Sequence, residues 1–269
     1  MAHTLRDKVS GLILDMDGVL YRGTQPLPGA RELFPALREA GLSYILLTNN
    51  ATLTAEDYSA KLAKMGMVVP AESILTTAQA TASYLAENYP QGGGIYVLGE
   101  PKLVDTLSRV PNFRLDGWRP DFVVVGLYFK FDYDSLQRAC AAIRRGARFI
   151  ATNIDATLPV EGGELWPGAG SIVAAVKTCA GVEPLVIGKP NTYMAGMALS
   201  RLELPPDQVL CVGDRLDTDI LMGARAGMPT ALVLTGVSRR EDIQDAEKAP
   251  ARPDYVFDDL PALMKALGI

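Results

Sequence analysis

Short apolar runs recur along the chain and alternate with segments whose apolar residues repeat at helical spacing. Runs that are apolar throughout are typical of parallel strands that are covered on both faces. The alternation of such strands with helices predicts an α/β fold with right-handed crossovers. The expected strands span residues 11–14, 43–47, 95–98, 122–126, 148–151, 185–187, 209–212, 230–234 and 255–257.

The middle of the chain has the pattern of a separate domain. A turn-rich stretch at residues 88–94 precedes a fresh set of strands and helices, and a loop-rich stretch at 158–171 comes after several of them. We therefore expect an inserted domain at residues 80–183. Residues 1–79 and 184–269 then form the core domain.

A helix is expected near the end of the chain. Asp258 can cap it, because a short polar side chain at a helix start accepts hydrogen bonds from the first backbone N–H groups. Pro261 then falls in the first turn, where proline is tolerated, and an apolar stripe at Leu263 and Leu267 follows it. We interpret this stripe as part of the core.

Two aspartates follow the first expected strand directly. Asp15 and Asp17 are one residue apart, and alternate side chains of an extended chain point the same way. Sites in open α/β sheets form at the carboxyl ends of strands, so both carboxylates can face one site. An ordinary Asp-Gly turn at Asp17 and Gly18 explains the same residues equally well.

Three further expected strands end in polar residues that can bind phosphate or metal. They are Thr48 with Asn49 and Asn50, then Lys189, then Asp214 with Asp219. A hydroxyl and amides suit phosphoryl oxygens, a lysine balances their charge, and carboxylates suit Mg²⁺. Each group by itself also fits a turn or a surface side chain. Together they predict one site with a nucleophile, an acid–base group, phosphate binders and a metal.

The composition excludes some kinds of catalytic chemistry and argues against some classes of partner. His3 is the only histidine, which excludes histidine nucleophiles, catalytic triads and His-ligated zinc. The net charge of −5 argues against nucleic acid as a partner. No apolar run reaches the roughly 20 residues that a membrane span needs. Cys140, Cys179 and Cys211 lack metal-ligand spacing, which favours buried thiols and a reducing, cytoplasmic location.

These motifs resemble the haloacid dehalogenase superfamily of phosphohydrolases, and in particular its NagD and 4-nitrophenylphosphatase branch. The resemblance runs from about residue 11 to residue 238. Its motifs lie at residues 15–23, 48–50, 151–155, 167–171, 188–190 and 213–220. It implies a Rossmann-like core and a large α/β cap in the long interval between Thr48 and Lys189. A homodimer is a further expectation from the family.

The resemblance also implies a mechanism and a set of roles. Asp15 would attack phosphorus, and Asp17 would protonate the leaving alcohol and then activate water. Mg²⁺ would be held by Asp15, by the Asp17 carbonyl and by Asp214, while Asp219 would orient a metal-bound water.

Thr48, Asn49, Asn50 and Lys189 would hold the phosphoryl group of a small phosphomonoester. In the cap, Asn153, Asp155 and the segment 158–166 are candidates for substrate contacts, although turn chemistry explains them equally well. Nucleoside monophosphates, sugar phosphates, phosphoglycolate, pyridoxal phosphate and aryl phosphates all remain candidate substrates.

Three other functions are alternatives to a phosphatase. A haloacid dehalogenase would use Asp15 to attack carbon, but it needs neither the acid at Asp17 nor the pair Asp214 and Asp219. A receiver-type signalling module would be much shorter than this chain. A phosphate-binding scaffold without catalysis would not require the complete set of motifs.

Overall fold

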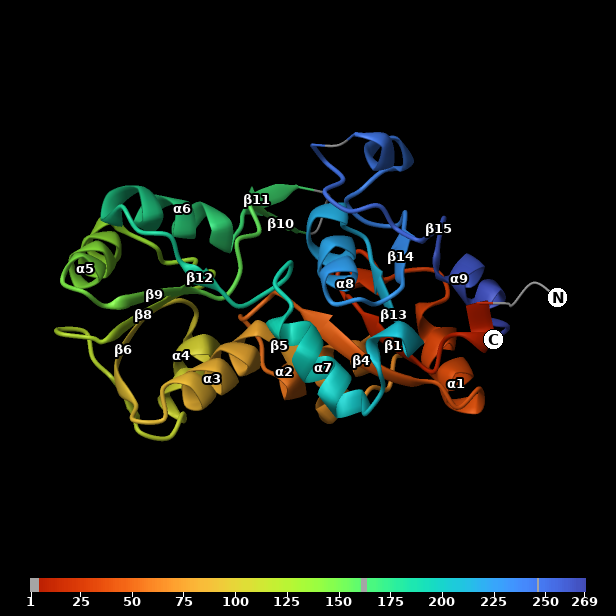
Figure 1. Ribbon diagram of the computed structural model, residues 1–269, viewed down its shortest axis with the longest axis horizontal. Coiled ribbons are helices and arrows are strands. Elements are labelled where there is room, and N and C mark those ends of the chain that lie inside the picture. The colour runs from red at the N-terminus through yellow and green to blue at the C-terminus, as the bar shows by residue number, and fades with distance from the viewer. Residues whose placement is uncertain (1–4, 161–163, 246) are drawn as a thin grey trace. The chain divides into compact units, whose positions relative to one another are not determined.

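The computed structural model describes residues 5–160, 164–245 and 247–269, and it divides the chain into two compact units (Figure 1). The core unit comprises residues 1–48, 55–75 and 189–269, and the inserted unit comprises residues 49–54 and 76–188. The sequence placed the ends of the insertion at residues 80 and 183. It assigned residues 49–54 to the core, whereas they cluster with the inserted unit.

A six-stranded sheet forms the centre of the core unit. Its order is β15 (Tyr255–Phe257), β14 (Thr230–Val233), β13 (Val209–Gly213), β1 (Gly11–Leu14), β4 (Ser43–Thr48) and β5 (Ile74–Thr76). The pairs from β15 to β4 are parallel. The strands β1, β13 and β14 are buried along their whole length, as expected for strands covered on both faces.

The register of the sheet brings the ends of three strands together. Leu14 at the end of β1 pairs with Val212 on β13 and with Leu46 on β4. The carboxyl ends of these strands therefore meet at one edge of the sheet. That edge is where open α/β folds place their sites.

Helices cover the sheet of the core unit. They are α1 (Ala30–Glu39), α2 (Ala55–Lys64), α7 (Tyr193–Leu202), α8 (Leu221–Arg225) and α9 (Leu260–Leu267). The helix α7 packs on β1 and β4, and α1 packs against β4 and α9 (Figure 1). A π-helical segment, η5 (Leu216–Ile220), connects β13 to α8.

The cap of α9 corrects one expectation. Asp259 is the capping residue, and its side chain accepts a hydrogen bond from the backbone N–H of Ala262 at 2.9 Å. The assignment of the cap to Asp258 was wrong by one residue. Asp258 instead pairs with Arg240 at 2.7 Å on the surface.

The inserted unit contains a second parallel sheet. Its order is β12 (Leu185–Val186), β9 (Arg148–Ala151), β8 (Phe122–Val125), β6 (Gly93–Leu98) and β7 (Phe113–Leu115). Its helices are α3 (Thr77–Asn88), α4 (Pro101–Ser108), α5 (Tyr133–Arg144) and α6 (Ala169–Ala180). Figure 1 shows α5 and α6 on one side of this sheet and α3 and α4 on the other.

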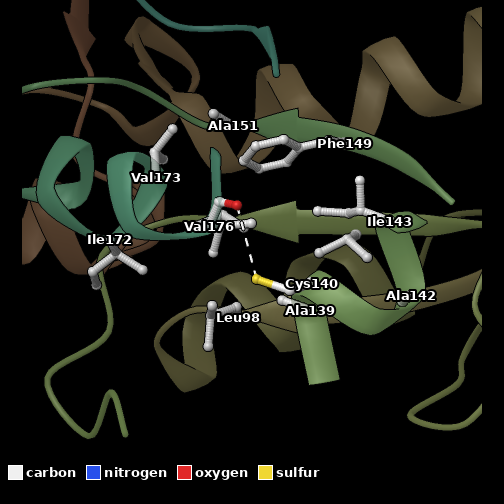
Figure 2. Packing of buried hydrophobic residues seen from close by; sticks show 12 residues of the cluster. Leu98, Ala139, Cys140, Ala142, Ile143, Phe149, Ala151, Ile172, Val173 and Val176 are labelled. Atoms are coloured by element: carbon white, nitrogen blue, oxygen red, sulfur yellow. Dashed lines mark hydrogen bonds between the residues drawn. The ribbon is translucent and has the colours of Figure 1, made fainter. Parts of the chain in front are cut away.

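One hydrophobic cluster of the inserted unit lies between its sheet and the helices α5 and α6. Figure 2 shows Cys140 among Leu98, Phe149 and Val176, with its thiol near the Val176 carbonyl oxygen at 3.8 Å. Cys140 and Cys211 are buried and Cys179 is half-buried. All three are free thiols, and the predicted burial is confirmed for Cys140 and Cys211 but not for Cys179.

Each of the nine expected strands is present, with its ends displaced by at most two residues. The predicted α/β fold with parallel sheets is confirmed. The sequence did not predict the short strands β5 and β7. It also missed two small hairpins, formed by β2 (Tyr21–Arg22) with β3 (Gln25–Pro26) and by β10 (Thr157–Pro159) with β11 (Leu165–Pro167).

Within the described residues, no helix combines the length and the apolar character that crossing a bilayer requires.

Candidate active site

The loop after β1 carries Asp15 and lies against Asp214. The Asp15 N–H donates to the Val212 carbonyl at 2.9 Å, which extends the register with β13 beyond the strand. Gly18 has a φ of 78°, a conformation that glycine adopts readily. A Cβ at Gly18 would lie only 2.5 Å from Oδ2 of Asp214. Both the backbone angle and this close approach therefore require glycine at position 18.

Lys189 joins two of the predicted acidic residues. Its Nζ donates to Oδ1 of Asp15 at 2.6 Å and to Oδ1 of Asp219 at 2.7 Å. The side chain of Lys189 is 5% exposed and that of Asp219 is 2% exposed. Asp15 follows β1 and Asp219 lies in η5 after β13, both in the six-stranded sheet, whereas Lys189 follows β12 of the other sheet.

Three carboxylates gather in the core unit. One oxygen from each of Asp15, Asp214 and Asp219 lies within 4.8 Å of the other two. Asp214 is further held by the Val237 N–H, which donates to Oδ2 at 2.7 Å. Asp219 accepts the Arg215 N–H at 3.1 Å. The backbone thus fixes two of the three carboxylates in place.

The donors at this cluster fit Mg²⁺. All the ligand atoms are carboxylate oxygens, which this hard cation prefers. Three ionised carboxylates beside one ammonium leave a net negative charge in a buried place, and buried charge is costly unless it is compensated. A divalent cation would compensate it.

The pKa values of the acids reflect this crowding. Burial raises the pKa of Asp15 to about 7, with Asp219 adding to the rise and Lys189 opposing it. Burial also raises the pKa of Asp214 well above its ordinary value, and the charges of Asp15 and Asp219 raise it further. Burial by itself would lower the pKa of Lys189, but the two carboxylates beside it raise that pKa overall. A bound cation would lower the pKa values of these acids, because it stabilises their ionised forms.

Asp17 has different neighbours from Asp15. Burial raises the pKa of Asp17, and the positive charges of Lys61 and Arg22 oppose that rise. The Nζ of Lys61 lies 4.0 Å from the centroid of the Tyr21 ring. Lys61 and Tyr21 were not among the predicted site residues, because nothing in their local pattern marks them.

Thr48 lies at the buried end of β4 and is 6% exposed. Burial raises the pKa of Tyr58, and a hydrogen bond with the Thr48 side chain opposes that rise. Tyr58 lies on α2 and is 2% exposed. Its helical spacing indicated a core residue, so its contact with Thr48 became visible only in the structure.

The remaining predicted residues lie in the inserted unit. Asn49, Asn153 and Asp155 form a hydrogen-bonded group there, although more than 100 residues separate Asn49 from the other two. The Oδ1 of Asn50 accepts the Thr52 N–H at 2.8 Å and thus closes a local turn. In the segment 158–166, residues 161–163 lie outside the described part of the chain.

Comparison with known proteins agrees with this arrangement. Residues 12–110 match the family described as haloacid dehalogenase-like hydrolase, and residues 186–263 match a family described as HAD-hydrolase-like. An acid sugar phosphatase of Staphylococcus saprophyticus is 38% identical over 255 residues, which are 95% of this chain and 96% of that protein. The chain belongs to the haloacid dehalogenase-like hydrolase family. The family matches cover the strand ends that carry Asp15, Thr48, Lys189 and Asp214.

Solved structures of family members have the same fold. The 4-nitrophenylphosphatase of Thermotoga maritima has a TM-score of 0.91 and 37% identity, covering 98% of this chain and 100% of that one. A glycerol phosphate phosphatase of Mycobacterium tuberculosis, solved in complex with magnesium, has a TM-score of 0.87 and 35% identity, covering 98% of this chain and 78% of that one. The predicted resemblance to the NagD and 4-nitrophenylphosphatase branch is confirmed. The chain is an enzyme of this family, a phosphatase.

Proposed function

We propose that the chain is a Mg²⁺-dependent phosphomonoester hydrolase that forms an aspartyl-phosphate on Asp15. The observation that carries this proposal is the buried cluster of Asp15, Asp214 and Asp219 with Lys189 bonded to two of them. Within the residues described, this group combines a nucleophilic carboxylate, a fixed cation and ligands for a metal.

In the first step a carboxylate oxygen of Asp15 attacks phosphorus while the bond from phosphorus to the leaving oxygen breaks. Asp17 gives its proton to that oxygen, so the alcohol leaves as a neutral molecule. The raised pKa of Asp17 supports this role, because burial favours the protonated form of this carboxyl.

The first step needs help with charge, because an anionic carboxylate approaches an anionic phosphoryl group. Lys189 is placed to neutralise part of this charge through its contact with Asp15 at 2.6 Å. Mg²⁺, when bound by Asp15, Asp214 and the Asp17 carbonyl, would neutralise more of it and orient the phosphoryl oxygens. Thr48 would bind a further phosphoryl oxygen through its hydroxyl, which the contact with Tyr58 orients.

In the second step water attacks the phosphorus of the aspartyl-phosphate, and Asp17 accepts its proton. The bond between Asp15 and phosphorus breaks, which releases inorganic phosphate and restores both aspartates. Each role assigned here belongs to a residue of the core unit.

The substrate class follows from the relatives in outline. The similar proteins are named acid sugar phosphatase, 4-nitrophenylphosphatase and glycerol phosphate phosphatase, names that refer to small phosphomonoester substrates. We propose that this chain also acts on small phosphomonoesters and that the inserted unit selects the leaving group. Substrate binding by Asn49, Asn50, Asn153 and Asp155 stays a prediction, as do the cytoplasmic location and the homodimer.

A phosphate-release assay tests the proposal. With 4-nitrophenyl phosphate as substrate, we expect turnover with Mg²⁺, none after EDTA treatment, and recovery when Mg²⁺ is added back. Asp15→Asn should lower kcat by more than about a thousandfold, because an amide is a poor nucleophile.

Asp217→Asn is the matched control for this assay. Asp217 lies close to the same site in sequence, but its side chain is 53% exposed and pairs with Arg215 on the surface. We expect normal turnover in this variant. Turnover without metal, or near-normal activity of Asp15→Asn, would contradict the proposed mechanism.

A further inference from the structure

Six residues of the inserted unit form a connected cluster, which we call the Asn49 cluster. It consists of Asn49, Thr77, Thr152, Asn153, Asp155 and Gly188. These residues come from four separate stretches of the chain. All of them lie on the inserted side of the division into two units.

The main chain of Asn49 is held by two side chains. Its carbonyl oxygen accepts the Thr77 hydroxyl at 2.7 Å and the Asn153 amide at 2.8 Å. Thr77 is 0% exposed, Asn153 is 4% exposed and Asn49 is 6% exposed. Buried hydrogen bonds of this kind are costly to break, because the separated groups find no water. The position of the Asn49 peptide is therefore fixed within the unit.

The side chain of Asn49 is held by Asp155. The Nδ2 of Asn49 lies 3.1 Å from both carboxylate oxygens of Asp155. The backbone N–H of Asp155 in turn donates to Oδ1 of Asn153 at 3.1 Å. The amide group of Asn153 and the carboxylate of Asp155 are thus directed at Asn49.

Gly188 belongs to the same cluster through a close approach. Its N–H donates to the Thr152 carbonyl at 2.8 Å. A Cβ at Gly188 would lie 2.5 Å from Oδ1 of Asn49 and 2.6 Å from the Thr152 carbonyl oxygen. Contact with Asn49 and Thr152, rather than an unusual backbone angle, therefore requires glycine at this position.

Two members of the cluster are adjacent in the chain to residues with proposed roles in the active site. Asn49 directly follows Thr48, and Gly188 directly precedes Lys189. Consecutive Cα atoms are about 3.8 Å apart, so fixing one residue restricts the next. The cluster thus fixes the backbone next to a residue assigned to phosphate binding and next to the lysine that contacts Asp15.

We propose that Asp155 is a positioning residue, which acts through Asn49 on the segments that carry Thr48 and Lys189. It is then not a ligand of the leaving group, although the sequence suggested substrate contact. This inference rests on the proposed function. Because Thr48 and Lys189 would meet the phosphoryl group that all substrates share, loss of Asp155 impairs every substrate equally.

Two substrates with unlike leaving groups test this assignment. We expect Asp155→Ala to lower kcat/KM by about tenfold for both 4-nitrophenyl phosphate and glycerol phosphate, by the same factor within error. Asp155→Asn keeps one acceptor for the Asn49 amide, so it should recover a large part of the loss. Unequal losses for the two substrates would overturn the proposal and indicate direct contact with the leaving group.

A double-mutant cycle separates positioning from general damage to the unit. Asp155→Ala should cause no further loss of kcat/KM in an Asn49→Ala background, because both changes remove the same contact. Additive losses would overturn the assignment. The control is Asp121→Ala, which removes a carboxylate that accepts the Gly94 N–H at 2.7 Å elsewhere in the unit. This variant should keep the wild-type kcat/KM even if its Tm falls.

The same assay distinguishes failure of the positioning role of Asp155 from failure of the proposed function. If the wild-type protein releases phosphate and Asp155→Ala is unimpaired, only the positioning role is overturned. If the wild-type protein releases no phosphate from any phosphomonoester in the presence of Mg²⁺, the proposed function fails, and the positioning role fails with it.

Discussion

Asp15 and Asp17 show how one residue type meets two environments within three positions of the chain. Burial raises the pKa of both carboxyls, but their neighbours differ. Asp15 faces Lys189 and other acids, an environment suited to an ionised nucleophile once a cation is bound. Asp17 lies near the positive charges of Lys61 and Arg22. Environment, rather than residue type, therefore distinguishes the proposed nucleophile from the proposed acid.

Gly188 provides a test of packing at the residue scale. We expect Gly188→Ala to lower kcat/KM at least about tenfold, because the added Cβ would lie within 2.6 Å of Asn49 and Thr152 and would displace the backbone before Lys189. Gly117→Ala is the matched control in the same unit, since a Cβ at Gly117 meets nothing within 4 Å. Equal activity of the two variants, measured by phosphate release, would contradict the packing argument.

At the scale of single elements, local signals account for most of the structure. The strands β1, β9 and β15 begin and end at the residues that the apolar pattern predicted. The short strands β5 and β7, of three residues each, were not predicted. The cap of α9 was missed by one residue because Asp258 and Asp259 are both good capping residues. Only the backbone geometry distinguishes them.

The cap of α9 gives a prediction at the element scale. Asp259→Ala should lower the free energy of unfolding by about 1 kcal/mol, because the Ala262 N–H loses its partner. Asp258→Ala removes only an ion pair with Arg240 whose side chains are 61% and 80% exposed, so its effect should stay below about 0.5 kcal/mol. Urea unfolding followed by circular dichroism measures both. A larger effect for Asp258→Ala would assign the cap to that residue instead.

At the scale of the whole molecule, the acid cluster links stability to pH and to metal. Asp15 has a pKa of about 7 in the folded protein against an ordinary value of 3.8, so the folded state binds its proton more tightly than the unfolded state does. This contribution to stability is fully present below the unfolded pKa. It is lost as the pH rises through the folded pKa.

We therefore expect metal-free protein to lose roughly 1 kcal/mol of unfolding free energy between about pH 6 and pH 8 through this group. Mg²⁺ should restore stability most strongly at the higher pH, where the carboxylates are ionised. The Tm measured with EDTA and with Mg²⁺ at both pH values tests this. The Asp15→Asn variant has no titratable group at this position, so its metal-free Tm should depend less on pH. A metal-free Tm that rises over this pH range would contradict the argument.

The candidate site could be predicted only in part. Asp15, Thr48 and Asp214 were identifiable because they lie at the ends of apolar strands, and parallel strands end at the same edge of a sheet. Lys189 also follows an apolar run, but its strand β12 is partly exposed and belongs to the other sheet. Lys61 and Tyr58 were not identifiable, because α2 has an ordinary helical pattern. Their relation to Asp17 and Thr48 depends on how that helix packs in the core unit.

The sequence by itself determined which segments become strands and which polar residues follow them, because burial and turn chemistry act over a few neighbouring residues. The tertiary structure decided which of those residues meet. Lys189 contacts Asp15 from 174 residues away, and Asp155 holds Asn49 across 106 residues. Contacts at such separations depend on the order and crossovers of the strands. For Asp155 this changed the interpretation from a substrate ligand to a residue that positions the chain beside Thr48.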